Sequence, residues 1–462
     1  MEPLIAVVGA TGTGKSKLAV DLASRFNGEI INGDAMQMYR GLPIITNQIP
    51  EDERNGIPHH LIGCVDLKEE PWRIGIFKKE CLRLINEIRS RGKLPILVGG
   101  THYYTQAVLF KDQTVANETE SSGQDDLLAE ESLSLESLSD KWPILNAPSD
   151  QVLQKLREVD PVMADRWHPN ETRKIRRSLE IFLQTGRPAS EIYEEQKRQK
   201  RSGNDLESSS GLLRFPTVVF WVHSGKEVLN SRLNTRVESM IDQGLLLEAE
   251  RMSNYLQESI SQGINIEKDK GVWVSIGFKE LAPYFEAVRE GSLTEEELES
   301  LKRTCVESIK TGTRQYAVQQ VKWIRNKLWR ALAEANMKNR LYLLDSTYVE
   351  DWGNSIAQPS ELVVNAFLRE ESLPDPRSFS ELAKKMYETL EAQSSRKTED
   401  GITKCITCDV CQKTMTNEEQ WKVHMTSAPH KRALRTAARK AERDEYFRQQ
   451  ELLKKKDQPT MS

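Results

Sequence analysis

Short apolar runs in the first hundred residues alternate with stretches whose hydrophobic positions have helical spacing. LIAVVG (4–9) has the composition of a buried strand and ends in a Gly-rich turn, and KSKLAVDLASRF follows it with the pattern of an amphipathic helix. EIING (29–33) and LPILVGG (94–100) predict two more strands, separated by a helical pattern from Trp72 to Arg91. This alternation predicts a parallel sheet with crossover helices.

The strand pattern breaks off after residue 112. Residues 113–150 are rich in Ser, Glu and Asp and lack periodicity, which predicts a disordered loop. Residues 151–201 have helical spacing, and PTVVFWV (216–222) then predicts a fourth core strand. LYLL (341–344) predicts the last strand, so the helical stretch is interpreted as an insertion into an α/β domain.

Charge is distributed unevenly along the 462 residues, although the net charge is only −4. Residues 116–150 carry nine acidic side chains against one Lys, whereas residues 431–456 carry ten basic side chains against four acidic. Local basic patches, rather than the total charge, set the affinity for phosphates.

Hydropathy and cysteine usage exclude two classes of protein. No apolar run approaches the roughly 18 residues of a membrane span, so no membrane partner is expected. Six cysteines in a chain of this length do not indicate a secreted disulfide scaffold. The N-terminus leads directly into a strand without a leader pattern, so we expect a cytoplasmic or nuclear protein, with a mitochondrial pool as an alternative.

GATGTGKS (9–16) matches the P-loop pattern G-x-x-x-x-G-K-[ST] and stands between a predicted strand and helix. Its glycines allow backbone N–H groups to face one anion, and the helix N-terminus and Lys15 add positive charge. Ser16 is the expected magnesium ligand. The motif alone does not specify which phosphate compound it binds.

Asp34 follows the second strand, at the edge of the sheet where α/β proteins bind ligands. A P-loop hydrolase usually ends a nearby strand in an aspartate, but LPILVGG leads instead into Thr101 and His102. An isolated Asp after a strand is more often a helix cap, so its candidacy depends on its neighbours.

A second motif lies near the C-terminus. Cys408 and Cys411, with His424 and His430, have the spacing of a structural two-Cys two-His zinc site. Cys405 makes an alternative CxxC pair with Cys408, which leaves the first ligand open.

The predicted fold class is therefore α/β: a P-loop NTPase-like parallel sheet with an inserted helical domain and a small C-terminal zinc finger. The expected parts are the P-loop domain (1–112 and 214–345), the insertion with its acidic loop (113–213), a polar linker (346–402), the finger (403–432) and a basic tail (433–462).

Seven ordered blocks resemble the tRNA dimethylallyltransferase, or tRNA isopentenyltransferase, family. After GATGTGKS, INGDAMQMYRGLPIITNQIP, IPHHLI and LPILVGGTHYY carry the resemblance. It continues in DPVMADRWHPNETRKIRRSLEIFLQTGRP (160–188), RVESMIDQGLLLE (236–248), SIGFKE (275–280) and TRQYAVQQVKWI (313–324). The resemblance covers most of 1–330, and the added finger is typical of the eukaryotic branch.

The resemblance implies transfer of a dimethylallyl group from dimethylallyl diphosphate to the exocyclic amine of the adenine immediately 3′ of the anticodon in tRNA. It makes Asp34 the general base, Thr11 a hydrogen-bond partner of the diphosphate and Arg236 its clamp. The implied diphosphate cradle is Gly9, Ala10, Thr11, Gly12, Thr13, Gly14, Lys15 and Ser16. The implied tRNA-binding residues are Asp34, Ala35, Met36, Gln37 and Thr101. The basic cluster of Arg173, Arg176 and Arg177 is expected to contact phosphates of the anticodon arm, with an exposed charged face as the alternative. Mg²⁺ and a structural Zn²⁺ are the expected cofactors, and the tRNA anticodon stem-loop is the expected partner of a monomer.

One segment departs from the family pattern. Val318 and Gln319 stand where the family usually has Lys-Arg before the glutamine. The departure keeps open a catalytically impaired tRNA-binding protein. A P-loop kinase that transfers phosphate from ATP to a small molecule is the other alternative.

Overall fold

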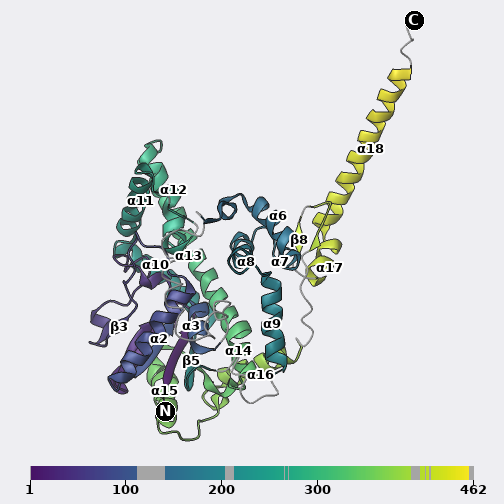
Figure 1. Cartoon of the computed structure of the whole chain (residues 1–462). Helices are drawn as coiled ribbons and strands as arrows, with labels where there is room; N and C mark the ends of the chain where they lie inside the picture. The colour runs from purple at the N-terminus through teal and green to yellow at the C-terminus, as the bar shows by residue number, and fades with distance from the viewer. Residues whose placement is uncertain are drawn as a thin grey trace. The chain divides into compact units, whose positions relative to one another are not determined.

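The structure, a computed structural model, describes residues 2–111, 141–202, 213–264, 266–268, 270–396, 406–411, 413–415 and 418–456. The chain divides into two compact units: unit 1 (Met1–Ala116 and Ser209–Arg396) and unit 2 (Asn117–Ser208 and Lys397–Ser462) (Figure 1). Most of the predicted acidic loop, residues 203–212 and Cys405 lie outside the described residues.

Six parallel strands form the sheet of unit 1, in the order β3-β2-β4-β1-β5-β6. They are β1 (Leu4–Gly9), β2 (Gly28–Asn32), β3 (His59–His60), β4 (Leu94–Gly99), β5 (Thr217–His223) and β6 (Leu341–Asp345). The predicted parallel sheet is confirmed, and β3 is an additional two-residue edge strand. The carboxyl ends of β1, β2 and β4 are neighbours, which brings the loops after them together.

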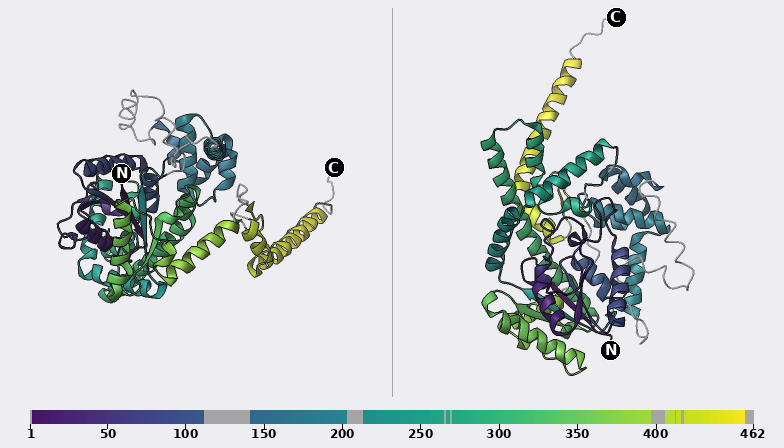
Figure 2. Two further views of the ribbon diagram at one scale, coloured as in Figure 1. Left: turned by 90° about the horizontal axis from the view of Figure 1, so that it is seen from below. Right: turned by 90° about the vertical axis from the view of Figure 1, so that its left-hand side faces the viewer.

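Helices cover both faces of this sheet (Figures 1 and 2). They include α1 (Lys15–Arg25), α2 (Ile74–Ser90), α3 (His102–Leu109), α10 (Lys226–Asp242), α11 (Leu245–Ser261), α12 (Phe278–Glu290), α13 (Glu295–Trp323), α14 (Trp329–Glu334), α15 (Gln358–Leu368) and α16 (Glu381–Arg396).

Alternate side chains of each strand enter two different cores. In β1, Leu4, Ala6 and Val8 pack with residues of α2, α11, α14 and α16. Ile5 and Val7 pack on the other face, with residues of α1 and α15. The strands are therefore apolar at every position because both faces of the sheet are covered.

Residues 346–396 are not a linker. Val363, Val364 and Phe367 of α15 are buried in the core on the α1 face, and Tyr387 of α16 is buried on the opposite face. Both helices are amphipathic, and the many polar residues on their exposed faces make the segment look like a linker in the sequence. The linker prediction is therefore wrong over 346–396, and 397–402 lies outside the described residues.

In unit 2, the inserted segment forms α6 (Ser149–Val159), α7 (Pro161–Arg166), α8 (Thr172–Thr185) and α9 (Ala189–Ser202). Asp160 is fully buried, and its two carboxylate oxygens accept hydrogen bonds from Met163 N at 3.1 Å and Ser190 N at 2.9 Å. This one side chain therefore fixes the start of α7 against that of α9. The end of the predicted disordered loop is folded, since Pro143–Asn146 form a turn of helix in which Leu145 is buried.

The C-terminal segment of unit 2 contains β7 (Ile406–Thr407), β8 (Thr414–Met415), α17 (Glu418–Thr426) and α18 (Ala428–Lys456). The predicted basic tail is thus helical as far as Lys456. Among the described residues, no helix has the length and apolar character needed to cross a membrane.

A buried carboxylate ties the edge of the sheet together at its end opposite the P-loop. Glu29, which is 3% exposed, lies 2.6 Å from Arg91 NH2, 2.7 Å from His60 Nε2 and 3.0 Å from Lys93 Nζ. Desolvation acts to raise the pKa of Glu29, but hydrogen bonds from Arg91, His60 and Lys93 outweigh it and lower the pKa to about 2.

Replacing Glu29 with Gln is expected to lower the free energy of unfolding at pH 7 by about 1–3 kcal/mol, because the three surrounding groups lose the negative charge and one of the two acceptor oxygens that they share. The pKa of Glu29 is depressed in the folded state, so its contribution is present above about pH 4.5 and is lost as pH falls toward about 2. Urea unfolding at pH 7 and pH 3.5 should therefore give a smaller difference between variant and parent at the lower pH.

Glu87→Gln is the control, because Glu87 also pairs with Arg91 but is exposed. A Glu29→Gln variant as stable as the Glu87→Gln variant at pH 7 would contradict the assignment.

Candidate active site and zinc centre

The P-loop turns tightly from β1 into α1. Gly12 and Gly14 have positive φ angles of 86° and 92°. A Cβ on Gly14 would lie 2.8 Å from the ring of Trp352, so the second glycine is required by packing as well as by conformation. Lys15 Nζ folds back to donate to Ala10 O at 2.8 Å, and Thr13 Oγ1 donates to the same carbonyl at 2.9 Å.

The charge of Lys15 is easily removed in this environment. The pKa of Lys15 is lowered to about 8, because burial and the positive charge of Arg236 together outweigh the opposite effect of the nearby Asp34 carboxylate. An anion bound in the loop would add a second negative partner and would hold Lys15 in its charged form. Ser16 follows in the first turn of α1, where it is exposed.

Asp34 is held in the loop after β2. Its backbone N–H donates to Asn32 Oδ1 at 2.9 Å, and its own Oδ1 accepts from Met36 N at 3.1 Å. Thr101 Oγ1 lies 3.5 Å from the same oxygen and accepts from Ala35 N at 3.1 Å. Desolvation by burial raises the pKa of Asp34, which makes the carboxylate a better proton acceptor.

A side chain at position 100 would have to displace Asp34 or Gln320. A Cβ there would lie 2.6 Å from Asp34 Oδ2 and 2.7 Å from Gln320 Nε2. The loop after β4 therefore approaches both side chains closely, and a substitution would displace the carboxylate.

Arg236 connects α10 to the P-loop. Its NH1 donates to Thr11 Oγ1 at 2.9 Å. On the same helix, Leu233 and Leu229 lie 2.8 Å and 3.1 Å from the position of a Cβ on Gly12, so α10 packs directly against the loop. Thr11 and Arg236, 225 positions apart in sequence, are thus adjacent in the fold.

Three residues on one face of α13 contact the loop after β4. Gln320 Nε2 donates to Gly100 O at 2.9 Å, and its Oε1 accepts from Thr11 N at 2.8 Å. Tyr316 hydrogen-bonds the side chains of Thr101 and Gln320. Trp323 stacks on the ring of His102 at 5.2 Å between centroids. These positions follow i, i+4, i+7 spacing, so one face of α13 joins two loops of the site.

The two residues that depart from the family pattern are next to this face in the sequence but are exposed. Val318 is 44% exposed and Gln319 is also exposed, whereas Gln320 is 3% exposed. The glutamine that connects the P-loop to Gly100 is therefore kept in this chain.

The remaining residues predicted to bind tRNA are Gln37 in unit 1 and three arginines in unit 2. Gln37 is half-buried, and its Nε2 donates to Asn47 O at 3.0 Å. In α8 of unit 2, Arg173 is exposed, while Arg176 and Arg177 lie 3.4 Å and 3.2 Å from the carboxylate of Glu180.

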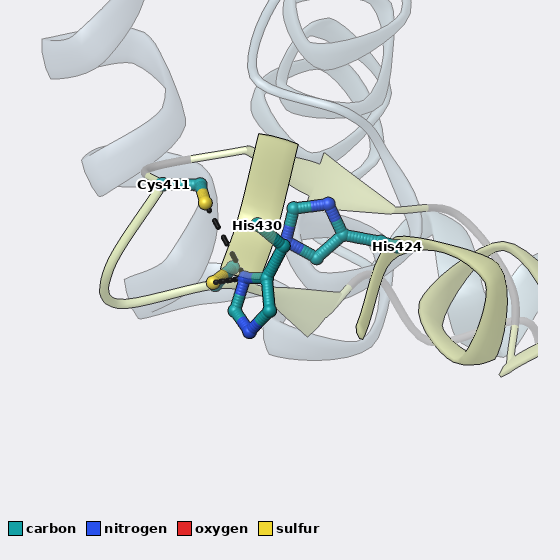
Figure 3. A group of neighbouring side chains, drawn as sticks. Cys411, His424 and His430 are labelled. Atoms are coloured by element: carbon teal, nitrogen blue, oxygen red, sulfur yellow. Dashed lines mark hydrogen bonds between the residues drawn. The ribbon is translucent and has the colours of Figure 1, made fainter. Parts of the chain in front are cut away.

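A second site lies in the C-terminal segment of unit 2 (Figure 3). The ligand atoms of Cys408, Cys411, His424 and His430 all lie within 4.8 Å of one another. His430 Nδ1 is 3.6 Å from Cys408 Sγ and 3.4 Å from Cys411 Sγ. A tetrahedral zinc ion with Zn–S and Zn–N bonds near 2.3 and 2.1 Å has S···N edges of about 3.6 Å. The four side chains therefore fit zinc.

We compared the chain that carries the P-loop site and the zinc site with known proteins. A model of the IPP transferase family matches residues 37–327. A tRNA dimethylallyltransferase of Schizosaccharomyces pombe is 35% identical over 450 residues, covering 96% of this chain and 97% of the relative. The chain belongs to the tRNA dimethylallyltransferase family.

Further relatives and a solved structure agree with this family membership. A human tRNA dimethylallyltransferase is 32% identical over 443 residues, covering 95% of this chain and 87% of the relative. A crystal structure of a eukaryotic dimethylallyltransferase acting on tRNA matches with a TM-score of 0.75 and 34% identity, covering 97% of this chain and 100% of that chain. A zinc-finger family described as double-stranded RNA-binding matches residues 405–431.

Sequence reasoning missed Gln320 and Tyr316 in this family member. The only available signal was the helical spacing that these two residues share with Trp323, because their partners lie more than 200 residues away. Their contacts connect the two loops on which the predicted catalytic residues stand.

Gln320→Ala is expected to weaken binding of inorganic diphosphate about tenfold and to lower the free energy of unfolding by about 1–3 kcal/mol. The Thr11 N–H and the Gly100 carbonyl both lose a buried partner in this variant. Gln319→Ala, on the exposed side of the same helix, is the control and should change neither quantity. Equal diphosphate affinities for the two variants would show that Gln320 does not position the P-loop.

Cys411→Ser is expected to reduce the zinc content of the purified chain from one ion per molecule to nearly none and to lower its helix content, because His430 lies in the first turn of α18. Elemental analysis and far-UV circular dichroism measure the two effects. Cys64→Ser, at a half-buried cysteine of unit 1, should retain the zinc. Full zinc occupancy in the Cys411→Ser variant would refute the ligand set.

Proposed function

We propose that this chain transfers a dimethylallyl group from dimethylallyl diphosphate to the exocyclic amine of the adenine immediately 3′ of the anticodon in tRNA. The observation that carries the proposal is the position of Asp34. Its half-buried carboxylate interacts electrostatically with Lys15 of the P-loop and contacts Thr101 on the neighbouring loop. A proton acceptor thus stands beside an anion cradle, which is the arrangement this reaction requires.

The reaction forms one bond and breaks another. The amine nitrogen attacks the allylic carbon, whose bond to the diphosphate oxygen breaks, and the diphosphate leaves with the electron pair. The amine proton passes to the carboxylate of Asp34, whose raised pKa favours its acceptance. Lys15 and Arg236 offset negative charge on the leaving group, and Thr11, held by Arg236, donates to it.

Magnesium fits the same cradle. Ser16 is exposed directly after Lys15, so its hydroxyl is accessible to a cation bound with the diphosphate. When bound, Mg²⁺ would neutralise part of the leaving-group charge. The remaining P-loop residues, Gly9 to Gly14, contribute backbone N–H groups to the anion.

Recognition of tRNA is assigned to both units. Extrusion of the target adenine gives the amine access to Asp34, with Ala35, Met36, Gln37 and Thr101 around the base. Amide side chains such as Gln37 can pair with an adenine edge. Arg173, Arg176 and Arg177 of α8 and the zinc finger supply contacts to the anticodon arm, consistent with the double-stranded RNA-binding description of the matching finger family.

The experiment that tests this proposal follows label from dimethylallyl diphosphate to unmodified tRNA, with and without magnesium. A tRNA that lacks the target adenine is the matched acceptor control. Label is expected only on the adenine-bearing tRNA. If tRNA binds but takes no label, the result supports the alternative hypothesis of a catalytically impaired tRNA-binding protein. If neither binding nor label is observed, phosphate transfer from ATP becomes the hypothesis to test.

Asp34→Asn should lower the transfer rate by at least about 100-fold, because the amide cannot accept the amine proton. Binding of tRNA and of diphosphate should change little, since the variant keeps the size and most hydrogen bonds of the parent. Single-turnover rates and separate binding measurements distinguish the two effects. A variant with near-parental transfer would rule out Asp34 as the base.

A further inference from the structure

Four arginines lie along one face of α18, beyond the zinc centre. At 100° per residue, Arg432, Arg435, Arg439 and Arg443 fall within about 80° of the helix circumference and span about 16 Å of its length. All four are exposed. The face thus presents a row of guanidinium groups.

Three of the four arginines have no stabilising side-chain contact within the described part of the chain. No ion pair or hydrogen bond is recorded for the side chains of Arg432, Arg435 or Arg439 with other described residues. Like charges three and four positions apart destabilise a helix by about 0.2–0.5 kcal/mol per pair. Residues 431–441 contain five basic and no acidic side chains, so the repulsion is not offset locally.

The opposite face of α18 is uncharged over the same stretch. Leu434, Ala437 and Ala438 lie there and are exposed. The four arginines are therefore segregated to one side of the helix, and Lys440 lies on its flank. A solvated helix gains nothing from this segregation, whereas a helix that lies along a line of phosphates does.

The zinc centre fixes the start of this face. His430 is buried in the first turn of α18, and its backbone N–H donates to Ser427 Oγ at 3.3 Å. Arg432 follows two residues later, so the metal site and the stripe belong to one rigid piece. α18 is drawn as one continuous helix (Figures 1 and 2).

We propose that this arginine stripe is a docking surface for the phosphate backbone of a helical stem of tRNA. The inference rests on the proposed function, which makes tRNA the substrate, and adds a surface that begins at the end of the zinc finger and continues along α18. Guanidinium groups pair with phosphate oxygens in bidentate geometry, and double-stranded RNA is recognised mostly through its backbone and shape. A straight cationic helix matches that target.

The test compares the zinc-loaded full chain with a variant that carries Arg432→Gln, Arg435→Gln and Arg439→Gln. Binding of labelled, unmodified tRNA is followed by fluorescence anisotropy over a range of KCl concentrations. Each lost phosphate contact lowers the slope of log K against log salt by about 0.7–0.9, so the slope should fall by about two to three. We expect at least tenfold weaker binding near 0.15 M salt, with kcat at saturating tRNA unchanged.

A charge-matched control carries Arg303→Gln, Arg369→Gln and Lys384→Gln, which remove three exposed cations of unit 1 outside the sites described. Its affinity and salt slope should stay within twofold of the parent. Gln is a good helix former, and zinc content and circular dichroism verify that both variants are folded.

A stripe variant with parental affinity and salt slope would overturn the proposal. So would arginine-dependent binding to phosphatidylserine vesicles with tRNA binding unchanged, because the surface would then face a membrane. Failure of the proposed function has a different signature. If the parent binds tRNA through the stripe but transfers no dimethylallyl group, the docking surface stands and the enzymatic assignment fails.

Discussion

The amide of Gln320 holds the active-site region of unit 1 together. Its oxygen accepts from Thr11 N, and its nitrogen donates to Gly100 O. The first contact fixes the P-loop after β1, and the second fixes the loop after β4, which carries Thr101. Since Thr101 in turn contacts Asp34, one side chain of α13 sets the separation between the anion cradle and the carboxylate. Without it, the sheet would bring the two loops to the same edge but would not fix their spacing.

Close packing around Gln320 has an electrostatic consequence. Lys15 and Asp34 are both withdrawn from water, and the neutral form of each is favoured by that burial. Each charge partly stabilises the other. An incoming anionic ligand changes this balance, since it supports the charge of Lys15 and competes with Asp34 for it. The site is therefore arranged so that binding at the cradle alters the proton affinity of the carboxylate.

The sequence was sufficient to predict the elements that are contiguous in it. The P-loop, the strands β1, β2, β4, β5 and β6 and the zinc ligands each follow a local pattern of fixed spacing. Gln320 and Tyr316 have no such pattern, because they stand on a helix that packs against loops more than 200 residues earlier in the chain. The positions that stand out in the sequence are Val318 and Gln319, which depart from the family pattern but are exposed.

The error over residues 346–396 has a related cause. The run VVNAFL, which supplies Val363, Val364 and Phe367 to the core, is short and is flanked by charged residues. A local reading of composition therefore favours a linker, and only the sheet reveals which face of α15 is buried. The functional roles of individual site residues stay predictions, because the positions of side chains do not by themselves establish chemistry.

Trp352 lies beyond the region that matches the family model, yet it is part of the same folded unit as the P-loop. Its ring packs against Gly14, its Nε1 donates to Asp21 Oδ2 at 3.0 Å, and Lys17 Nζ lies 4.7 Å from the ring centroid. The matched region ends at residue 327, yet the P-loop rests on a tryptophan beyond it. A chain that ended at residue 327 would keep the P-loop and lose the tryptophan that packs against it. The segment after β6 is thus part of the packing that holds the start of the chain in place.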